Sequence, residues 1–337
     1  MLTRRTALAA ALTAAPMIRT ARADPRNLNI SHQFPGSNGE EGDFRDRTCR
    51  RFAAEVEKRT GGALTFTVYP NSSLVKTFAQ ISALRKGALD LSLVPTAYGG
   101  GEIPELNITF MPAVIGSYEQ GFAWKKNAIG KAMTDLLDAK GIKLVTWLWQ
   151  SGGIASRVGP ILRPADVKGL KVRGGSKEMD EMFQAAGAAV STMPSNELYI
   201  AMKTGVMDAA VTSSSSLISF RLEETCKNLT SARGSSFFYI LEPILMSKAI
   251  YESLPADQQK AIMEVGESLE AWATEQAKAD DAALDAVFQK AGIKVSRIDP
   301  DMLKEWRDLA RESAWKGYAA KSAGCANFLK MAEQVTA

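Results

Sequence analysis

Short apolar runs alternate along this chain with longer segments in which apolar residues recur every three or four positions. The short runs predict β-strands and the periodic segments predict amphipathic α-helices. Regular alternation of the two is typical of α/β folds. The first such series predicts a strand at 28–30, a helix at 44–59, a strand at 64–69, a helix ending at 86 and a strand at 89–94.

The same order of elements occurs a second time. In both series a glycine ends the last helix and an aspartate begins the last strand, first as Gly87 and Asp90 and then as Gly205 and Asp208. One such copy is ordinary α/β punctuation, but two copies in matching order favour two similar lobes that face each other across a cleft. The second series predicts a strand at 170–172, a helix at 177–186, a strand at 188–193, a helix ending at 203 and a strand at 207–212.

Two apolar runs and one long periodic segment lie outside the two series. Residues 142–149 and 237–246 predict strands that cross between the lobes and form a hinge. Residues 255–290 predict one helix, which at 1.5 Å per residue is about 50 Å long and is expected to brace both lobes. The expected division is lobe I at 24–149, lobe II at 150–236, and the return strand, bracing helix and C-terminal helices at 237–337.

The first 23 residues have the features of an export signal peptide. Arg4 and Arg5 precede an alanine-rich apolar run at 7–18, and the Ala-Arg-Ala sequence at 21–23 offers a cleavage site. The run is shorter than the roughly 20 apolar residues of a membrane-spanning helix. The paired arginines favour the twin-arginine export route over the general secretory route. We therefore expect a periplasmic protein, with an uncleaved N-terminal anchor as the alternative.

The formal charge of the chain, +4 at neutral pH, comes from this leader. Residues 1–23 hold four of the 41 lysines and arginines and no acid, so the rest carries 37 basic and 37 acidic side chains. A nucleic-acid partner is not expected, because it requires a basic surface. The three cysteines, Cys49, Cys226 and Cys325, lack metal-site spacing and are too few for a disulfide framework. Whether two of them pair stays open.

Arg173 is the strongest candidate for a ligand-binding residue. It ends the predicted strand at 170–172 and precedes Gly174 and Gly175, so its side chain is expected at the carboxyl end of a strand. Ligands of open α/β sheets bind at that edge. A guanidinium group offers a planar pair of donors that matches a carboxylate. The alternative is an arginine in solvent at a strand end.

Other candidates follow from the same reasoning about strand ends. The hydroxyl-rich segment 212–216 precedes a predicted helix near 217, where free amides favour anions, although one of its serines is expected to cap the helix. Arg157 is the best of several arginines for a second positive charge. Aromatic side chains near strand ends are expected to form cleft walls. The full predicted set is Arg173, Thr212, Ser213, Ser214, Arg157, Trp149, Gln150, Tyr98, Phe237 and Gln33.

Catalytic motifs are missing from the sequence. It contains no H-E-x-x-H, no G-x-S-x-G, no G-x-x-x-x-G-K and no G-x-G-x-x-G after a strand. His32 is the only histidine, and no Cys/His cluster accompanies it. We therefore expect no catalytic residues, no metal and no cofactor. Paired carboxylates, and with them an enzyme on the same scaffold, stay an open alternative.

The segment 164–173, P-A-D-V-K-G-L-K-V-R, resembles the D-x-K-G-L-K-x-R hallmark of the DctP-like solute-binding proteins of tripartite ATP-independent periplasmic (TRAP) transporters. The likeness extends in order over nearly all of the chain after residue 23. It implies a two-lobed periplasmic-binding-protein-like fold that captures a small organic acid anion and delivers it to membrane subunits driven by an ion gradient. Capture for a sensory receptor is the alternative.

The resemblance also implies residue roles. Family members bind the ligand carboxylate with the arginine that ends the hallmark, which is Arg173 here, and use the segment that corresponds to 212–214. Many members carry a second arginine directly after the glycine pair at 152–153, whereas three residues separate that pair from Arg157. Some members hold a cation with an acid after the position of Asp208, which this chain lacks. The ligand therefore need not be a C4-dicarboxylate, and a monocarboxylate with an apolar body also fits.

Overall fold

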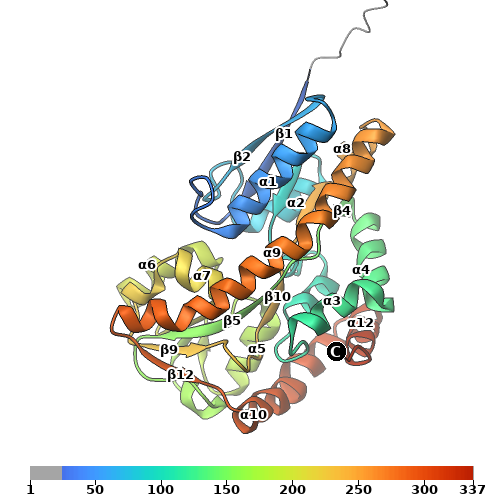
Figure 1. Cartoon of the computed structure of the whole chain (residues 1–337). Coiled ribbons are helices and arrows are strands. Elements are labelled where there is room, and N and C mark those ends of the chain that lie inside the picture. The colour runs from blue at the N-terminus through green and yellow to red at the C-terminus, as the bar shows by residue number, and fades with distance from the viewer. Residues whose placement is uncertain (1–24, 337) are drawn as a thin grey trace, which may run out of the picture.

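The computed structural model describes residues 25–336, which fold into two lobes that each contain one twisted sheet (Figure 1). The N-terminal signal peptide predicted at 1–23 lies outside these residues. The sheet of lobe I has the order β2 (Leu64–Tyr69), β1 (Arg26–His32), β3 (Leu91–Leu93), β11 (Ile244–Ser247) and β4 (Ile142–Leu144). Strands β1, β2 and β3 run parallel, and β11 runs antiparallel to β3 and β4.

The sheet of lobe II has a similar parallel core with antiparallel additions. Strand β6 is parallel to β7 and β8, whereas β5 is antiparallel to β8 and β9. The strand order is β12 (Lys294–Arg297), β9 (Asn228–Ser231), β5 (Trp149–Ser156), β8 (Ala209–Ser213), β6 (Lys171–Arg173) and β7 (Ala189–Val190), and β10 (Tyr239–Leu241) also pairs with β5.

Helices cover the sheets in the order that the periodicity predicts. Asp43 caps α1 by accepting from the backbone of Arg45, and Ser176 caps α5 in the same way. The helices are α1 (Phe44–Arg59), α2 (Gln80–Arg85), α3 (Tyr118–Lys126), α4 (Ala128–Ala139), α5 (Lys177–Ala185), α6 (Leu198–Thr204), α7 (Ser214–Ser219), α8 (Lys248–Glu252), α9 (Ala256–Lys290), α10 (Pro300–Ala310), α11 (Lys316–Ala319) and α12 (Ala323–Glu333). Short 3-10 helices include η1 (Thr77–Ala79), η2 (Thr96–Gly99), η3 (Pro104–Phe110) and η5 (Ser195–Glu197).

Two chain segments cross between the sheets. The chain leaves the first sheet after β4 and enters the second with β5, and it returns through β10 and β11. The single strand predicted at 142–149 is therefore two strands in different lobes, because residues 145–148 bridge them. The strand predicted at 188–193 is also shorter, since only Ala189 and Val190 pair with β6.

The long helix α9 extends across both lobes, as expected (Figure 1). Its side chains Val265 and Leu269 pack in the core of lobe I, and Leu284 and Phe288 pack in the core of lobe II. The helix therefore joins the two cores. No helix within residues 25–336 has both the length and the apolar character to cross a membrane.

The C-terminal helices tie further segments together. The indole of Trp306 donates to the carbonyl of Leu162, and Tyr318 donates to the carbonyl of Glu105. All three cysteines are buried and unpaired, so the described chain contains no disulfide.

Candidate functional site

Strand directions bring most of the predicted residues to one edge of the lobe II sheet. Arg173 ends β6 and Ser213 ends β8, and these strands are parallel. Because β5 runs antiparallel to β8, its first residues Trp149 and Gln150 lie at the same edge. In lobe I, Gln33 follows β1 and Tyr98 lies in η2 after β3, so both come from the carboxyl edge of that sheet. The two edges meet between the lobes.

Arg173 is buried where the lobes touch, with only 1% of its surface exposed. Its Nε donates to the carbonyl of Met193 at 2.9 Å and its Nη1 to the carbonyl of Val211 at 2.7 Å. Its Nη2 donates to the hydroxyl of Tyr98 in lobe I at 3.0 Å. A guanidinium has five N–H donors, so these bonds leave two for a ligand.

Gly175 makes room for the guanidinium. Its φ is +100°, and a Cβ built on it would lie 2.6 Å from Nη1 of Arg173 and 3.0 Å from the ring of Phe110. A side chain at this position would therefore displace the guanidinium group, besides straining the backbone.

Tyr98 connects Arg173 to the open part of the cleft. Its hydroxyl also accepts from the backbone amide of Ser195 at 3.3 Å, so both of its lone pairs are used. Its own proton has no acceptor among residues 25–336 and is available to a ligand. The ring stacks edge-on against Phe78 with 5.0 Å between centroids. Tyr98 is therefore a polar donor as well as the apolar wall that we predicted.

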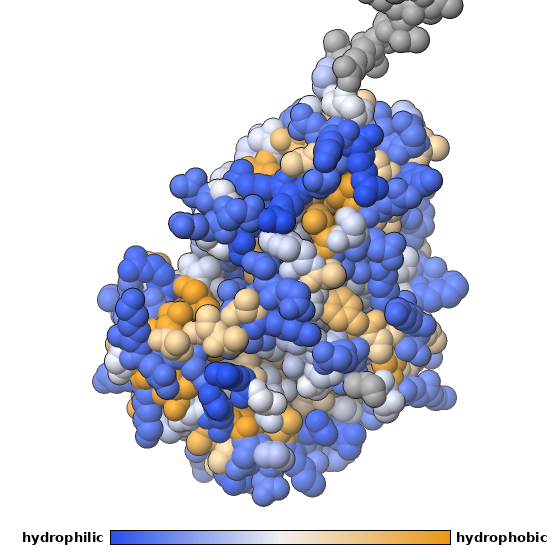
Figure 2. Space-filling model, in the orientation of Figure 1, coloured by the Kyte–Doolittle hydropathy of each residue, from blue (hydrophilic) through white to orange (hydrophobic). Residues whose placement is uncertain are grey.

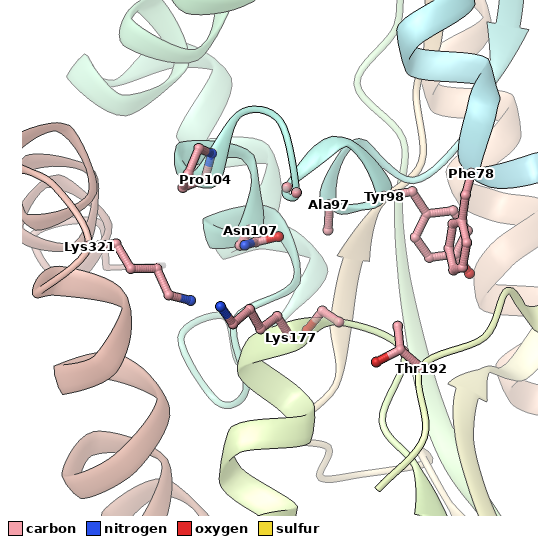
Figure 3. A pocket seen from close by; sticks show the side chains of 12 residues that line it. Phe78, Ala97, Tyr98, Pro104, Asn107, Lys177, Thr192 and Lys321 are labelled. Carbon is pink, nitrogen blue, oxygen red and sulfur yellow. The ribbon is translucent and has the colours of Figure 1, made fainter.

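A cavity of about 630 Å³ lies beside Tyr98 between the lobes (Figure 3). The amino groups of Lys177 and Lys321 point toward each other in this space, near the amide of Asn107 (Figure 3). Lys321 pairs with the buried carboxylate of Glu178 at 2.5 Å. The lining comprises Phe78, Ala97, Tyr98, Gly100, Gly101, Pro104, Asn107, Gly175, Ser176, Lys177, Thr192 and Lys321.

Several buried polar groups near this edge have no hydrogen-bond partner within residues 25–336. Both amide atoms of Gln33 are unpartnered, as are Oε1 of Gln150 and Nε1 of Trp149. Each residue is at most 1% exposed. An unpartnered buried polar group costs about 1–3 kcal/mol, so natural proteins rarely keep one without a purpose. The three residues do not line the cavity beside Tyr98, and they stay candidates for contact with a ligand between the lobes.

A second buried arginine, Arg45, connects the two lobes. The sequence did not predict it as a site residue. It is fully buried and pairs with Asp43 at 2.7 Å and with Glu242 at 3.2 Å. It also donates to the lobe II hydroxyls of Ser213 at 3.2 Å and Ser216 at 2.9 Å. We call Arg45, Asp43, Glu242, Ser213 and Ser216 the Arg45 cluster.

The cluster carries both favourable and unfavourable electrostatics. Burial opposes ionisation of Asp43, but the Arg45 guanidinium outweighs it and holds the pKa of Asp43 below its usual value. Burial raises the pKa of Glu242 despite the same cation. Nothing in the sequence distinguishes Arg45 from the five other arginines and lysines of α1.

The cluster changes what the serine segment does. The Ser213 hydroxyl caps α7 by accepting a hydrogen bond from the amide of Ser216, and it accepts another from the guanidinium of Arg45. It is therefore committed within the protein, contrary to the expectation that it contacts a ligand. Thr212 is 3% exposed and Ser214 is 1% exposed, and Oγ of Ser214 has no partner within the described chain. These two residues stay candidates.

Arg157 does not join the group, and its predicted place in the cleft is wrong. It follows the last residue of β5, and its amide donates to the carbonyl of Asp208, which precedes β8. Arg157 therefore lies at the opposite edge of the lobe II sheet from Arg173. Several residues of extended chain separate Gln150 from it at about 3.3 Å each, so it lies well beyond hydrogen-bonding reach of the cleft edge.

The predicted aromatic residues have different surroundings. Phe237 packs against Trp306 at 4.8 Å and Phe183 at 6.3 Å, in the core under the C-terminal helices. Trp149 packs edge-on against Trp124 at 5.3 Å, and Gly121 leaves room for its ring. Phe237 is thus a core residue, while Trp149 combines a core ring with an unpartnered N–H.

Within residues 25–336 no group of three His, Cys, Asp or Glu side chains is arranged to hold a metal ion. His32 is fully buried, and its Nε2 lies 3.0 Å from a carboxylate oxygen of Asp46. The donors at the cleft edge are the remaining N–H groups of Arg173 and the hydroxyl of Tyr98, and they suit an anion.

Comparisons with known proteins agree with this geometry. Residues 36–321 match the family described as bacterial extracellular solute-binding protein, family 7. A solute-binding protein of Albidiferax ferrireducens is 54% identical over 93% of both chains. A C4-dicarboxylate-binding periplasmic protein, DctP, of Rhodobacter capsulatus is 30% identical over 76% of both. The crystal structure of a TRAP periplasmic solute-binding protein of Rhodoferax ferrireducens with bound malonate has a TM-score of 0.90 at 55% identity, covering 91% of this chain and 98% of that one.

Proposed function

The chain belongs to the bacterial extracellular solute-binding proteins of family 7, and from this we propose that it binds a small organic acid anion in the periplasm and delivers it to a TRAP-type membrane transporter. The observation that carries the proposal is the buried Arg173 with two unused donors, held between lobes beside a cavity. The malonate bound by the similar Rhodoferax protein supports a carboxylate as the ligand group.

The chemistry of capture follows from burial. A carboxylate that reaches Arg173 accepts from the two remaining N–H groups, and the phenol of Tyr98 donates a further bond. Charge-assisted bonds of this kind are about twice as strong as neutral ones, and exclusion of water strengthens them. The ligand therefore exchanges its hydration shell for donors that are already fixed in place.

Closure couples this binding to the transporter. Arg173 belongs to lobe II and Tyr98 to lobe I, so the complete donor set exists only when the lobes touch. The segments at 145–148 and 242–243 are the hinge, because each connects a strand of one sheet directly to a strand of the other. The third connection between the sheets is α9 with the chain that follows it. A transporter that recognises both lobes at once distinguishes the loaded protein from the empty one.

Calorimetric titration with malonate and a panel of mono- and dicarboxylates tests the proposal. Arg173→Ala is expected to cost about 2–5 kcal/mol of binding, the range for removing one partner of a buried charge pair. Since 1.4 kcal/mol is a factor of ten, affinity falls at least about tenfold. Arg173→Lys is also expected to bind poorly, because an ammonium group cannot reproduce the planar fork.

Arg157→Ala is the matched control, since it removes an arginine from the far edge of the same sheet. It is expected to leave carboxylate affinity unchanged. Circular dichroism and a melting curve establish that each variant is folded. Equal affinities for the wild type, Arg173→Ala and Arg173→Lys would remove Arg173 from the site, and a wild type that binds no carboxylate of the panel would refute the proposed function.

We also propose export with cleavage after Ala23. The paired Arg4 and Arg5 support the twin-arginine route. Replacing both with lysine is expected to retain the protein in the cytoplasm, as measured by fractionation. N-terminal sequencing of the periplasmic form is expected to begin at Asp24. Normal export of the double-lysine variant would assign the protein to the general secretory route instead.

A further inference from the structure

A second group of cations lies at the far edge of the lobe II sheet. Arg157, Lys203 and Lys227 line a cavity of about 500 Å³ together with Val158, Glu224, Thr225 and Cys226. The amide of Lys227 donates to the carbonyl of Ser156, and the amide of Arg157 donates to that of Asp208, so backbone bonds fix both residues beside β5. This cavity is separate from the cleft that contains Arg173.

The three positively charged side chains have no salt-bridge partner among residues 25–336. None of the three side chains forms an ion pair or a hydrogen bond with another residue of 25–336, although many other lysines and arginines do. The acid of the cavity, Glu224, is committed to Arg221 and to the hydroxyl of Tyr199 at 2.9 Å. Burial raises the pKa of Cys226 to about 12, so its thiol is neutral. The cavity therefore carries a concentrated positive charge.

Arg157 is positioned for recognition. It is half-buried, and its guanidinium lies against the backbone of Gly205, where a Cβ would be 2.8 Å from Nη1. Gly205 ends α6 with a φ of +78°, so a glycine is required for the turn and for the contact. The guanidinium is thus held against the chain at Gly205, and Arg157 lines the cavity. A guanidinium held in this way beside the two exposed ammonium groups of Lys203 and Lys227 suits a tetrahedral oxyanion.

We propose that this cavity binds a phosphate or sulfate group, as a second anion site that is independent of the cleft. A doubly charged oxyanion neutralises the three cations far better than a single carboxylate. Its oxygens accept from the guanidinium of Arg157 and from the amino groups of Lys203 and Lys227.

The surroundings of the cavity indicate two sources for such a group. Exposed apolar side chains lie near it in the chain: Val158 lines it at 56% exposure, and Ile200 at 63% and Val206 at 53% are close in sequence to the lining residue Lys203. Figure 2 shows hydrophobic residues among hydrophilic ones on the lobe that carries α6 and α7. Cations beside exposed apolar side chains are typical of proteins that contact phospholipid headgroups. Free inorganic phosphate is the other source.

Titration of the whole mature protein with inorganic phosphate at low ionic strength tests the site, because salt screens exposed charges. One equivalent is expected to bind the wild type. Arg157→Ala and Lys227→Ala are each expected to weaken binding about tenfold or more. Lys86→Ala, which removes an exposed lysine of lobe I, is the control and is expected to have no effect. Melting curves confirm that the variants are folded.

Two further measurements separate this site from the cleft and identify the source. Arg173→Ala is expected to retain phosphate binding, whereas loss in that variant but not in Arg157→Ala would place the anion in the cleft and overturn the proposal. Flotation with phosphatidylglycerol vesicles distinguishes a lipid headgroup from the free ion. The wild type is compared with Ile200→Ser and Arg157→Ala, and loss of vesicle binding in both variants supports the headgroup. No phosphate binding together with no vesicle binding overturns the proposal.

Discussion

Replacing Arg45 by methionine is expected to destabilise the protein more than the loss of any surface arginine. The substitution keeps most of the side-chain volume but leaves the carboxylates of Asp43 and Glu242 buried without their cation. Breaking a buried ion pair by removing one partner costs about 3–5 kcal/mol. For domains of about 150–250 residues, each kcal/mol lowers Tm by about 2–4 °C, so the expected decrease is about 6–20 °C.

Thermal unfolding by circular dichroism measures this change, with Arg59→Met as the matched control. Arg59 lies at the other end of α1 and pairs with Glu264 at 3.1 Å, but both side chains are about half exposed. A surface pair of this kind contributes about 0–1 kcal/mol. The contrast between the two variants isolates the effect of burial, because both remove an arginine from the same helix.

The pH dependence provides a second test of the same reasoning. In the wild type, Arg45 holds the pKa of Asp43 below its unfolded value, so this pair contributes stability above about pH 4 and loses it as the pH falls. In Arg45→Met the same buried carboxyl lacks its cation, its pKa rises, and protonation stabilises the fold. The deficit of the variant is therefore expected to be largest near pH 7 and to narrow toward pH 4.

A rescue variant tests whether Glu242 causes part of the cost. Adding Glu242→Gln to Arg45→Met removes one of the two buried negative charges and is expected to recover part of the lost Tm. A deficit below about 1 kcal/mol at pH 7, or one that stays constant from pH 7 to pH 4, would refute the account of the Arg45 cluster.

Three further changes have outcomes that the structure predicts. Gly175→Ala is expected to reduce carboxylate affinity at least tenfold in calorimetry with little loss of secondary structure, because its Cβ would displace the Arg173 guanidinium. The three buried thiols are expected to stay unreactive toward Ellman's reagent until the protein is denatured. The denatured protein is then expected to show three reactive thiols per chain, and a smaller number would reveal a disulfide. Burial opposes ionisation of Asp46, but hydrogen bonds from His32, Arg50 and Ser37 outweigh it and lower the pKa of this carboxyl. The free energy of unfolding of the wild type, measured by chemical denaturation, is therefore expected to fall below about pH 4. Asp46→Asn is expected to be less stable at pH 7 and to lose less stability as the pH falls.

Local sequence signals predicted the regular elements well, since each has a local physical cause. The strand at 64–69 and the helix at 44–59 have the predicted bounds, because Asp43 caps the helix and Gly61 and Gly62, both at positive φ, end it. The long helix ends at Lys290 as predicted, since its apolar positions recur without a break until Gly292. The α/β fold with two lobes followed from the repeated order of these elements.

The direction of a strand is not a local property, and this is where the prediction for Arg157 failed. The apolar run at 142–149 predicts one strand, and Arg157, which follows it, is predicted to supply a second positive charge to the ligand. In the structure β5 begins at Trp149 and runs away from the cleft, antiparallel to β8. Its amino end therefore holds Gln150 at the cleft, and its carboxyl end carries Arg157 to the far edge. Only the pairing of strands distant in sequence reveals this.

Under the proposed function, the unsatisfied groups between the lobes give a ligand a reason to favour closure. With the lobes in contact, Gln33, Gln150 and Trp149 keep buried polar atoms without partners in the described chain, at about 1–3 kcal/mol each. Shifting an equilibrium between open and closed forms from 1:99 to 99:1 takes about 5.5 kcal/mol of preferential binding. The two magnitudes are comparable, so a ligand that partners these groups and the free donors of Arg173 supplies enough energy to reverse the balance. The cost of the contact between the lobes thus lies where the proposed ligand binds, and this links occupancy to shape.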